Sequence, residues 1–289
     1  MWRIDTRRSG SALDISFWLI AVPALFLLLF FVLPNAVILS TSLLKSQDQV
    51  LTNELTTENF ELILGKPHYL RAILRTFLVG IAVGLIVALV SLPISYFLVR
   101  TRTRYKGLLI VLSLSPLLAS VVVRTYGWYV ILDRFGFVNN VLIDLGLIVD
   151  RIAFIPSTWG IILGLSHAML PYGILTNIAA LSSINPNLES AAMSLGASRT
   201  RTLRDILLPL VRPGLVASFL LAFSISISAY ATPAILGGYA SQTIATLIYT
   251  FIMQVLDWSL GAALAAILVI ATVAILLLSA RFGGKRNDL

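Results

Sequence analysis

The sequence NPNLESAAMSLGASRTRTLRDILLPLVRPG occupies residues 185–214 and lies between two long apolar segments. It contains four arginines and two acids, whereas residues 158–184 and 215–256 contain no Lys, Arg, Asp or Glu. If the apolar segments lie in a membrane, a polar insert of this length is expected to contact something in the aqueous phase.

The composition indicates that the rest of the chain is embedded in a membrane. Hydrophobic residues make up 58% of the 289 residues, charged residues only 12%, and the mean hydropathy is +0.94. Soluble proteins carry about 25% charged residues. A helix that crosses a bilayer needs about 20 mostly apolar residues. The pattern predicts an all-α integral membrane protein, a single domain of residues 1–289, with six transmembrane helices at residues 15–39, 72–99, 107–132, 158–181, 208–232 and 258–281.

The distribution of basic residues predicts the orientation of these spans. One side of the membrane would hold 14 Lys and Arg residues and the other side 6. Because cytoplasmic loops carry the excess of basic residues, both termini and the insert are expected in the cytoplasm. Basic residues that cluster at span ends indicate contact with membrane lipid rather than nucleic acid. The cytoplasmic set is Arg3, Arg7, Arg8, Arg100, Arg102, Arg104, Lys106, Arg199, Arg201, Arg204, Arg212, Arg281, Lys285 and Arg286.

Three other segments are expected at the outer side or at its interface. Residues 243–256 are apolar but too short to span the membrane, so they predict a re-entrant or interfacial helix. Residues 135–147 have apolar side chains at helical spacing and predict an amphipathic surface helix. The mixed polar residues 41–70 predict an outer rim rather than a folded domain. The N-terminal basic segment resembles a signal peptide, but the apolar run at residues 15–39 is too long for one, so an uncleaved first span is expected.

The insert itself predicts a helix, a turn and a second helix. Asn185 and Pro186 are typical of a helix start. Gly196 would end the first helix, and Ser198 would cap the second. Small residues on the first helix would let another protein come close, which indicates a docking element. An interfacial hairpin that holds lipid phosphates is an equally good interpretation at this stage.

The motif ESAAMSLGA at residues 189–197 is followed by ILLP at residues 206–209 and by Pro213. This pattern resembles the EAA loop of permease subunits of bacterial ABC importers, with Ser190 in place of the usual alanine. Five further segments are similar to the spermidine/putrescine-type permeases, namely PLLASVVVRTYGWYVIL, FGFVNNVLIDLGLI, LPYGIL, ILGG and DWSLGAA at residues 116–132, 135–148, 170–175, 235–238 and 257–263.

The resemblance implies a type I importer permease of the bacterial inner membrane, with the insert as a cytoplasmic coupling helix. It also implies a second permease in a heterodimer, two cytoplasmic ATPase subunits and an extracytoplasmic substrate-binding protein. ATP and magnesium would bind to the ATPase subunits, since this chain lacks a phosphate-binding G-x-x-x-x-G-K-[ST] motif. We expect no cofactor, no metal and no catalytic residue here; the chain has no Cys, and His68 and His167 have no spaced partners. The implied coupling residues are Glu189, Ala191, Ala192, Gly196, Ala197 and Ser198.

Polar residues within the spans predict the substrate pathway, because such residues are costly in a membrane. Each has a structural alternative: Arg124 would form an ion pair or extend to the interface, Asp257 would be a helix-terminal acid, and serines in the fifth span would allow close helix packing. His167 more often indicates a hydrogen bond between helices than a ligand. The candidate pathway residues are Arg124, Tyr126, Trp128, Ser228, Tyr230, Asp257 and Trp258.

A polyamine is the expected substrate, followed by amino acid derivatives, opines or aminophosphonates. Residues 229–231 carry no acid where several relatives have one, so the pore itself gives no sign of strong cation selectivity. An ion-coupled secondary carrier is a competing class, but it would need more intramembrane carboxylates than Asp257. A multi-span enzyme would need a spaced set of catalytic residues, which we do not find.

Overall fold

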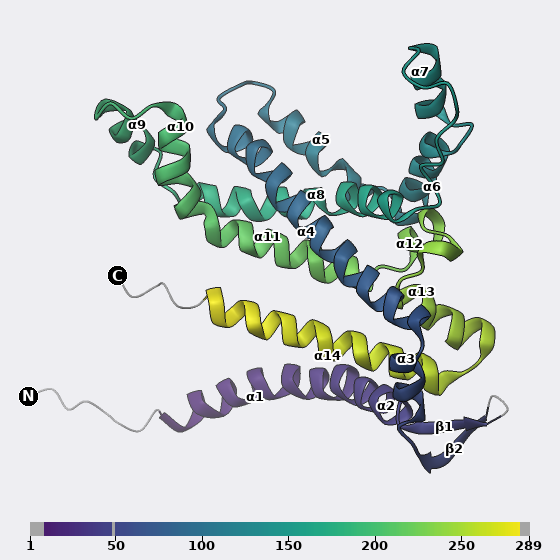
Figure 1. Ribbon diagram of the computed structural model, residues 1–289. Coiled ribbons are helices and arrows are strands. Elements are labelled where there is room, and N and C mark those ends of the chain that lie inside the picture. Colours follow the sequence, from purple (N-terminus) through teal and green to yellow (C-terminus); the bar gives the residue numbers. More distant parts are fainter. Residues whose placement is uncertain (1–8, 48–49, 284–289) are drawn as a thin grey trace, which may run out of the picture.

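The computed structural model describes residues 9–47 and 50–283. Arg3, Arg7, Arg8, Lys285 and Arg286, which contribute to the predicted orientation, lie outside this part of the chain. The described residues are mostly helical, which confirms the predicted fold class (Figure 1).

The first half of the chain contains two strands and eight helices in the described residues. The elements are α1 (Ser9–Leu27), a π-helical turn (Leu28–Val32), α2 (Leu33–Thr41), β1 (Leu44–Gln47), β2 (Val50–Leu55), α3 (Glu58–Gly65), α4 (Pro67–Arg100), α5 (Lys106–Leu118), α6 (Val121–Leu132), α7 (Phe137–Asp144) and α8 (Thr158–Ser182).

The second half begins with the insert and ends in a long helix. The elements are α9 (Asn187–Ser194), α10 (Arg199–Thr202), a π-helical turn (Leu203–Leu207), α11 (Leu208–Ser228), α12 (Ala231–Leu236), a 3-10 turn (Tyr239–Ser241), α13 (Ile244–Tyr249), a π-helical turn (Thr250–Val255) and α14 (Trp258–Gly283).

Five helical segments in the described part of the chain are long and apolar enough to cross a membrane, and a bent pair of helices supplies a sixth. That pair differs from the continuous helix expected at residues 107–132. Ala119 and Ser120 are both extended, with ψ values of 138° and 139°, and the helices on either side meet at 96°. The third predicted span is therefore broken in its middle.

The fifth predicted span also ends early. α11 stops at Ser228, Ala229 is extended, and α12 begins at Ala231. Proline has no N–H to donate to the carbonyl four residues earlier, and its ring clashes with that carbonyl. Pro233 therefore removes a helical hydrogen bond at the Ala229 carbonyl, where the helix is interrupted.

The segment at residues 41–70 is more ordered than the predicted polar rim. β1 and β2 form an antiparallel hairpin, and α3 follows it. The Asn59 side chain on α3 donates to the carbonyls of Ser42 and Leu44, at 3.1 and 3.0 Å. These bonds attach α3 to the start of the hairpin.

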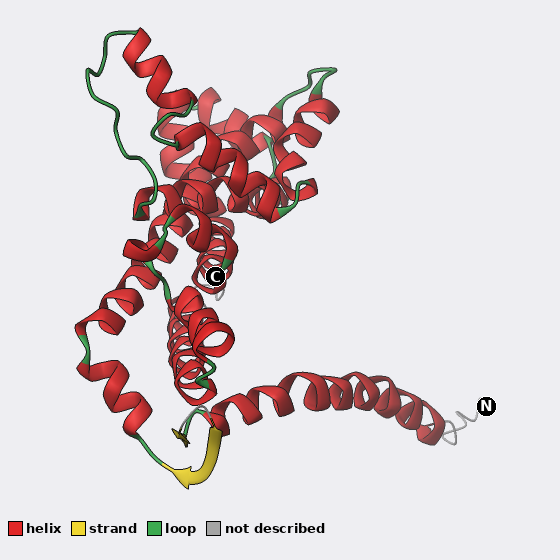
Figure 2. Cartoon of the chain, turned by 90° about the vertical axis from the view of Figure 1, so that its right-hand side faces the viewer, coloured by secondary structure: helices red, strands yellow, loops and turns green. Residues whose placement is uncertain are grey.

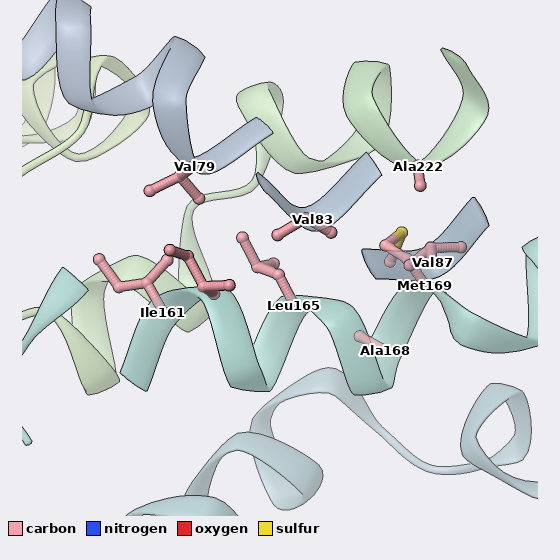
Figure 3. Packing of buried hydrophobic residues seen from close by; sticks show 9 residues of the cluster. Val79, Val83, Val87, Ile161, Leu165, Ala168, Met169 and Ala222 are labelled. Atoms are coloured by element: carbon pink, nitrogen blue, oxygen red, sulfur yellow. The ribbon is translucent and has the colours of Figure 1, made fainter. Parts of the chain in front are cut away.

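The main core lies where α4, α8 and α11 cross. Valines spaced four residues apart on α4 pack against one face of α8 (Figure 3). Gly173 allows this close approach, because a Cβ at that position would lie 2.5 Å from the Val87 side chain. The labelled core residues are Val79, Val83, Val87, Ile161, Leu165, Ala168, Met169 and Ala222.

A second apolar cluster joins α3, α4, α13 and α14. By contrast, no side chain from Trp18 to Thr41 is buried. Figure 2 shows the N-terminal helix leading away from the rest of the molecule, and only its α2 end packs beside α14. In Figure 1, α9 and α10, the start of α1 and the end of α14 lie towards the left, and the hairpin and α7 lie at the right.

Candidate functional site

The first helix of the insert has the predicted ends. The Asn185 side chain accepts a hydrogen bond from the Asn187 amide at 3.0 Å. Gly196 has a φ of +88°, and its amide donates to the Met193 carbonyl while the Ala197 amide donates to the Ala192 carbonyl, both at 3.0 Å. This is a Schellman ending, which favours glycine at the residue of positive φ.

The second helix of the insert starts as predicted from Ser198. The Ser198 hydroxyl accepts a hydrogen bond from the Arg201 amide at 3.3 Å, and α10 then passes through a π-helical turn into α11. The insert is thus a folded helix–turn–helix, joined directly to α8 and α11.

The exposed surface of the insert combines polar residues with several protruding apolar side chains. Leu195 is 90% exposed, and Leu188 and Met193 are also exposed. Of the predicted coupling residues, Ala191, Gly196 and Ser198 are exposed, Ala197 is partly exposed and Ala192 is buried. Exposed apolar side chains rimmed by polar residues are typical of a site where another protein binds.

Glu189 is not on that exposed surface. Its side chain is only 12% exposed and contacts the C-terminal end of α4. Arg100 Nε donates to Glu189 Oε1 at 2.8 Å, Arg100 Nη2 forms an ion pair with the same oxygen at 2.7 Å, and the Tyr96 hydroxyl donates to Oε2 at 2.8 Å. We call these three residues the clamp.

The sequence pattern did not identify Tyr96 and Arg100 as part of this site. Arg100 is one of the basic residues that predict the orientation, and Tyr96 lies within a predicted apolar span. A signal was present, because residues four apart share one helix face. A tyrosine and an arginine at that spacing, on the last turn of a span, are suited to bind one carboxylate.

The predicted pathway residues do not form one cluster. Arg124 donates through Nη1 to the carbonyl of Pro116, across the break between α5 and α6. Carbonyls in the last turn of a helix have no partner within the helix, so this bond stabilises the end of α5. Trp128, one turn further along α6, donates to His167 Nδ1 at 3.2 Å, which agrees with a helix–helix bond for His167.

The remaining candidates lie on other elements. Asp257 caps α14, because its Oδ1 accepts bonds from the Leu260 amide at 3.1 Å and the Ser259 hydroxyl at 2.9 Å. The Tyr230 ring stacks on Tyr249 with centroids 4.5 Å apart. Ser228 hydrogen-bonds within its own helix, to carbonyls one turn back, and Tyr126 and Trp258 are exposed.

Among the described residues, no group of three or more His, Cys, Asp or Glu side chains could hold a metal ion. What the geometry offers is an exposed helix–turn–helix at one end of a helical body.

Comparison with known proteins agrees with this geometry. The chain is 29% identical over 255 residues to the spermidine/putrescine transport system permease protein PotB of Salmonella typhimurium (strain SL1344), covering 87% of this chain and 88% of that protein. It is 28% identical over 231 residues to the putative ferric transport system permease protein FbpB 1 of Haemophilus influenzae, covering 78% and 35%.

A solved structure has the same fold. A chain of the bacterial alginate ABC transporter in complex with its alginate pentasaccharide-bound periplasmic protein superimposes with a TM-score of 0.78 at 18% identity, covering 98% of this chain and 99% of that one. The family model for the inner membrane component of binding-protein-dependent transport systems matches residues 80–283, which is more than half of the chain. The chain therefore belongs to this family, the permease components of ABC importers.

Proposed function

We propose that this permease forms half of a transmembrane pathway, together with a second permease subunit of different sequence. Two ATPase subunits would bind in the cytoplasm and hydrolyse ATP, and an extracytoplasmic binding protein would deliver the substrate. The chain itself is a transport subunit and not an enzyme. The observation that carries the proposal is the outward surface of the insert, with Leu188, Ala191, Leu195 and Gly196 exposed at one end of the helical body.

The proposed substrate is a polyamine such as spermidine or putrescine. The name of the Salmonella relative supports this class. The pathway would bind the cation through aromatic faces rather than carboxylates, because Asp257 is already engaged as a helix cap. A cation within about 6 Å of a Tyr or Trp ring centroid is attracted to the ring face. Tyr126, Trp128 and Tyr230 are the aromatic candidates.

Arg124 would act in this pathway as a structural brace. Its guanidinium bonds to the end of α5. A cationic side chain would also repel a polyamine, so direct contact with the substrate is unfavourable.

A matched pair of substitutions tests the docking surface. Leu195→Asp places a charge on the exposed surface of the insert, and Val149→Asp makes the same kind of change at a residue that is 94% exposed between α7 and α8. We expect Leu195→Asp to abolish co-purification of the ATPase subunits and Val149→Asp to preserve it. Both variants should insert into the membrane.

The transport assay uses proteoliposomes with both permeases, the ATPase subunits and the binding protein. Radiolabelled spermidine should accumulate only when ATP is present on the side of the membrane that carries the ATPase subunits and the binding protein is present on the opposite side. Full ATPase binding by Leu195→Asp would contradict the docking proposal. ATP-dependent uptake of another solute, with none of spermidine or putrescine, would contradict the substrate class alone.

A further inference from the structure

Three helices of the main core end at the insert, and they are attached in two different ways. α8 leads into α9 along the chain, and the insert leads into α11 along the chain. α4 has no such connection, because residues 101–105 carry the chain from its end to α5. The clamp links α9 to α4 through polar side chains, beside the apolar cluster that packs Tyr96 and Val99 against Leu207.

We propose that the clamp makes α4 move with the coupling helix, so that α4, α8 and α11 respond to the ATPase as one rigid body. Arg100 and Tyr96 are then positioning residues that act through Glu189. The proposal extends the proposed function, since it requires the insert to be the site where the ATPase binds.

The geometry of the clamp favours a rigid link over a loose tether. Both oxygens of the Glu189 carboxylate are engaged, one by Arg100 and the other by Tyr96. Two attachment points from successive turns of α4 prevent the carboxylate from rotating about a single bond. Arg100 Nη2 also lies 3.5 Å from the Ile184 carbonyl, at the start of the insert.

The burial of the charges makes the clamp costly to open. The side chains of Arg100 and Glu189 are 19% and 12% exposed. Separating a partly buried pair leaves each charge without its partner and away from water. The other ion pair of the insert differs in this respect: Arg201 and Asp205 are 3.8 Å apart and their side chains are 74% and 57% exposed.

Close contacts of α4 with α8 and α11 would transmit a displacement of its C-terminal end to the main core. A Cβ on Gly80 would lie 2.4 Å from Ile227 on α11, and a Cβ on Gly173 of α8 would lie 2.5 Å from Val87 on α4. Helices in such close contact do not slide independently. A displacement at Arg100 therefore reaches both neighbouring helices.

The test measures the distance between α9 and α4 in the assembled complex. The chain has no Cys, so Ser194→Cys on α9 and Leu89→Cys on α4, both at exposed positions, give two unique spin-label sites. The distance distribution is recorded by electron spin resonance without nucleotide and with ATP plus vanadate. We expect the same distribution in both states when the clamp is intact.

Three variants separate the clamp from other roles of these residues. Arg100→Gln should make the distance depend on nucleotide and lower spermidine uptake per ATP by roughly tenfold, the range of typical couplings between sites. Arg201→Gln should change neither. The double variant Arg100→Gln/Glu189→Gln leaves no unpaired charge, so its complex with the ATPase subunits should assemble even where that of the single variant does not. Its loss of spermidine uptake per ATP should be no larger than that of Arg100→Gln.

The outcomes distinguish this inference from the proposed function. If the intact complex changes its α9–α4 distance with nucleotide, or if the doubly neutral variant keeps a constant distance and full uptake per ATP, the clamp proposal is wrong. If the ATPase subunits do not bind the unmodified permease at all, the proposed function fails first.

Discussion

Gly196 controls the shape of the insert through its backbone. Its φ of +88° lies in a region where residues with a Cβ are strained, and the two bonds of the Schellman ending depend on that conformation. A Cβ at this position would meet nothing within 4 Å. Any effect of a substitution therefore comes from backbone strain and not from a clash.

We predict that Gly196→Ala disfavours the folded turn by about 1–2 kcal/mol, the cost of a left-handed conformation for a residue with a Cβ. Gly196→Asn should cost less, because asparagine tolerates this conformation better. The control is Gly127→Ala within α6, where a Cβ also meets nothing within 4 Å and φ is not positive. Thermal unfolding in detergent and co-purification of the ATPase subunits would measure the effect. Equal stability of Gly196→Ala and Gly127→Ala would contradict the prediction.

Single residues were predictable from sequence where their role is local. Gly196 and Ser198 were confirmed in their positions at helix ends, because caps involve neighbours within a few residues. The contacts of Glu189 could not be predicted, because its partners lie 89 and 93 positions away along the chain. Its part in coupling remains a proposal, now through α4 rather than by direct contact with the ATPase.

Proline explains part of how the helical elements differ from the expected spans. Pro116 removes a donor for the Leu112 carbonyl, and the Ser115 hydroxyl bonds that carbonyl instead, at 2.8 Å. Span lengths could be predicted because they follow from hydropathy. The break at Ala119 and Ser120 could not, because two extended residues within an apolar run leave the hydropathy unchanged.

The crossing of α4 and α8 depends on close backbone approach at Gly173. We predict that Gly173→Ala lowers the stability of the protein by about 1–3 kcal/mol, as overpacking in a filled core does. A Cβ there would lie 2.5 Å from Val87 and 2.9 Å from the Ser91 hydroxyl. Ser91 also accepts a hydrogen bond from the buried Asn177 side chain at 2.8 Å, so a shift of α4 would strain that bond.

The matched control for this crossing is Gly107→Ala, in the helix α5. A Cβ at Gly107 meets nothing within 4 Å, so the substitution should leave the unfolding temperature in detergent unchanged or slightly higher. If Gly173→Ala is as stable as Gly107→Ala, then the crossing has more free space than its interatomic distances indicate.

On the scale of the whole molecule, the segments predicted to form the more basic side lie together at one end of the structure. The insert and the end of α4 lie at one end, and the hairpin and α7 lie at the other (Figure 1). The count of Lys and Arg residues alone predicted which segments share one side of the membrane. It could not predict that α4, α8 and α11 form a common block, because their contacts are between residues far apart in sequence.

The orientation itself is testable because the chain has no Cys. Arg102→Cys lies in the exposed connection after α4, and Val149→Cys lies in the exposed connection after α7. We predict that a membrane-impermeant maleimide labels Val149→Cys in intact spheroplasts and Arg102→Cys only after the membrane is opened. The physical reason is that the more basic side of a membrane protein stays in the cytoplasm.

The unmodified chain, which has no thiol to react, is the control for background labelling in both conditions. Labelling of Arg102→Cys in intact spheroplasts, with Val149→Cys protected, would invert the orientation. The exposed surface around Leu195 would then face outward, where no ATP is available, and the ATPase could not bind there. Protection of both positions until the membrane is opened would place both connections on the cytoplasmic side, and an even number of spans between the two positions would follow.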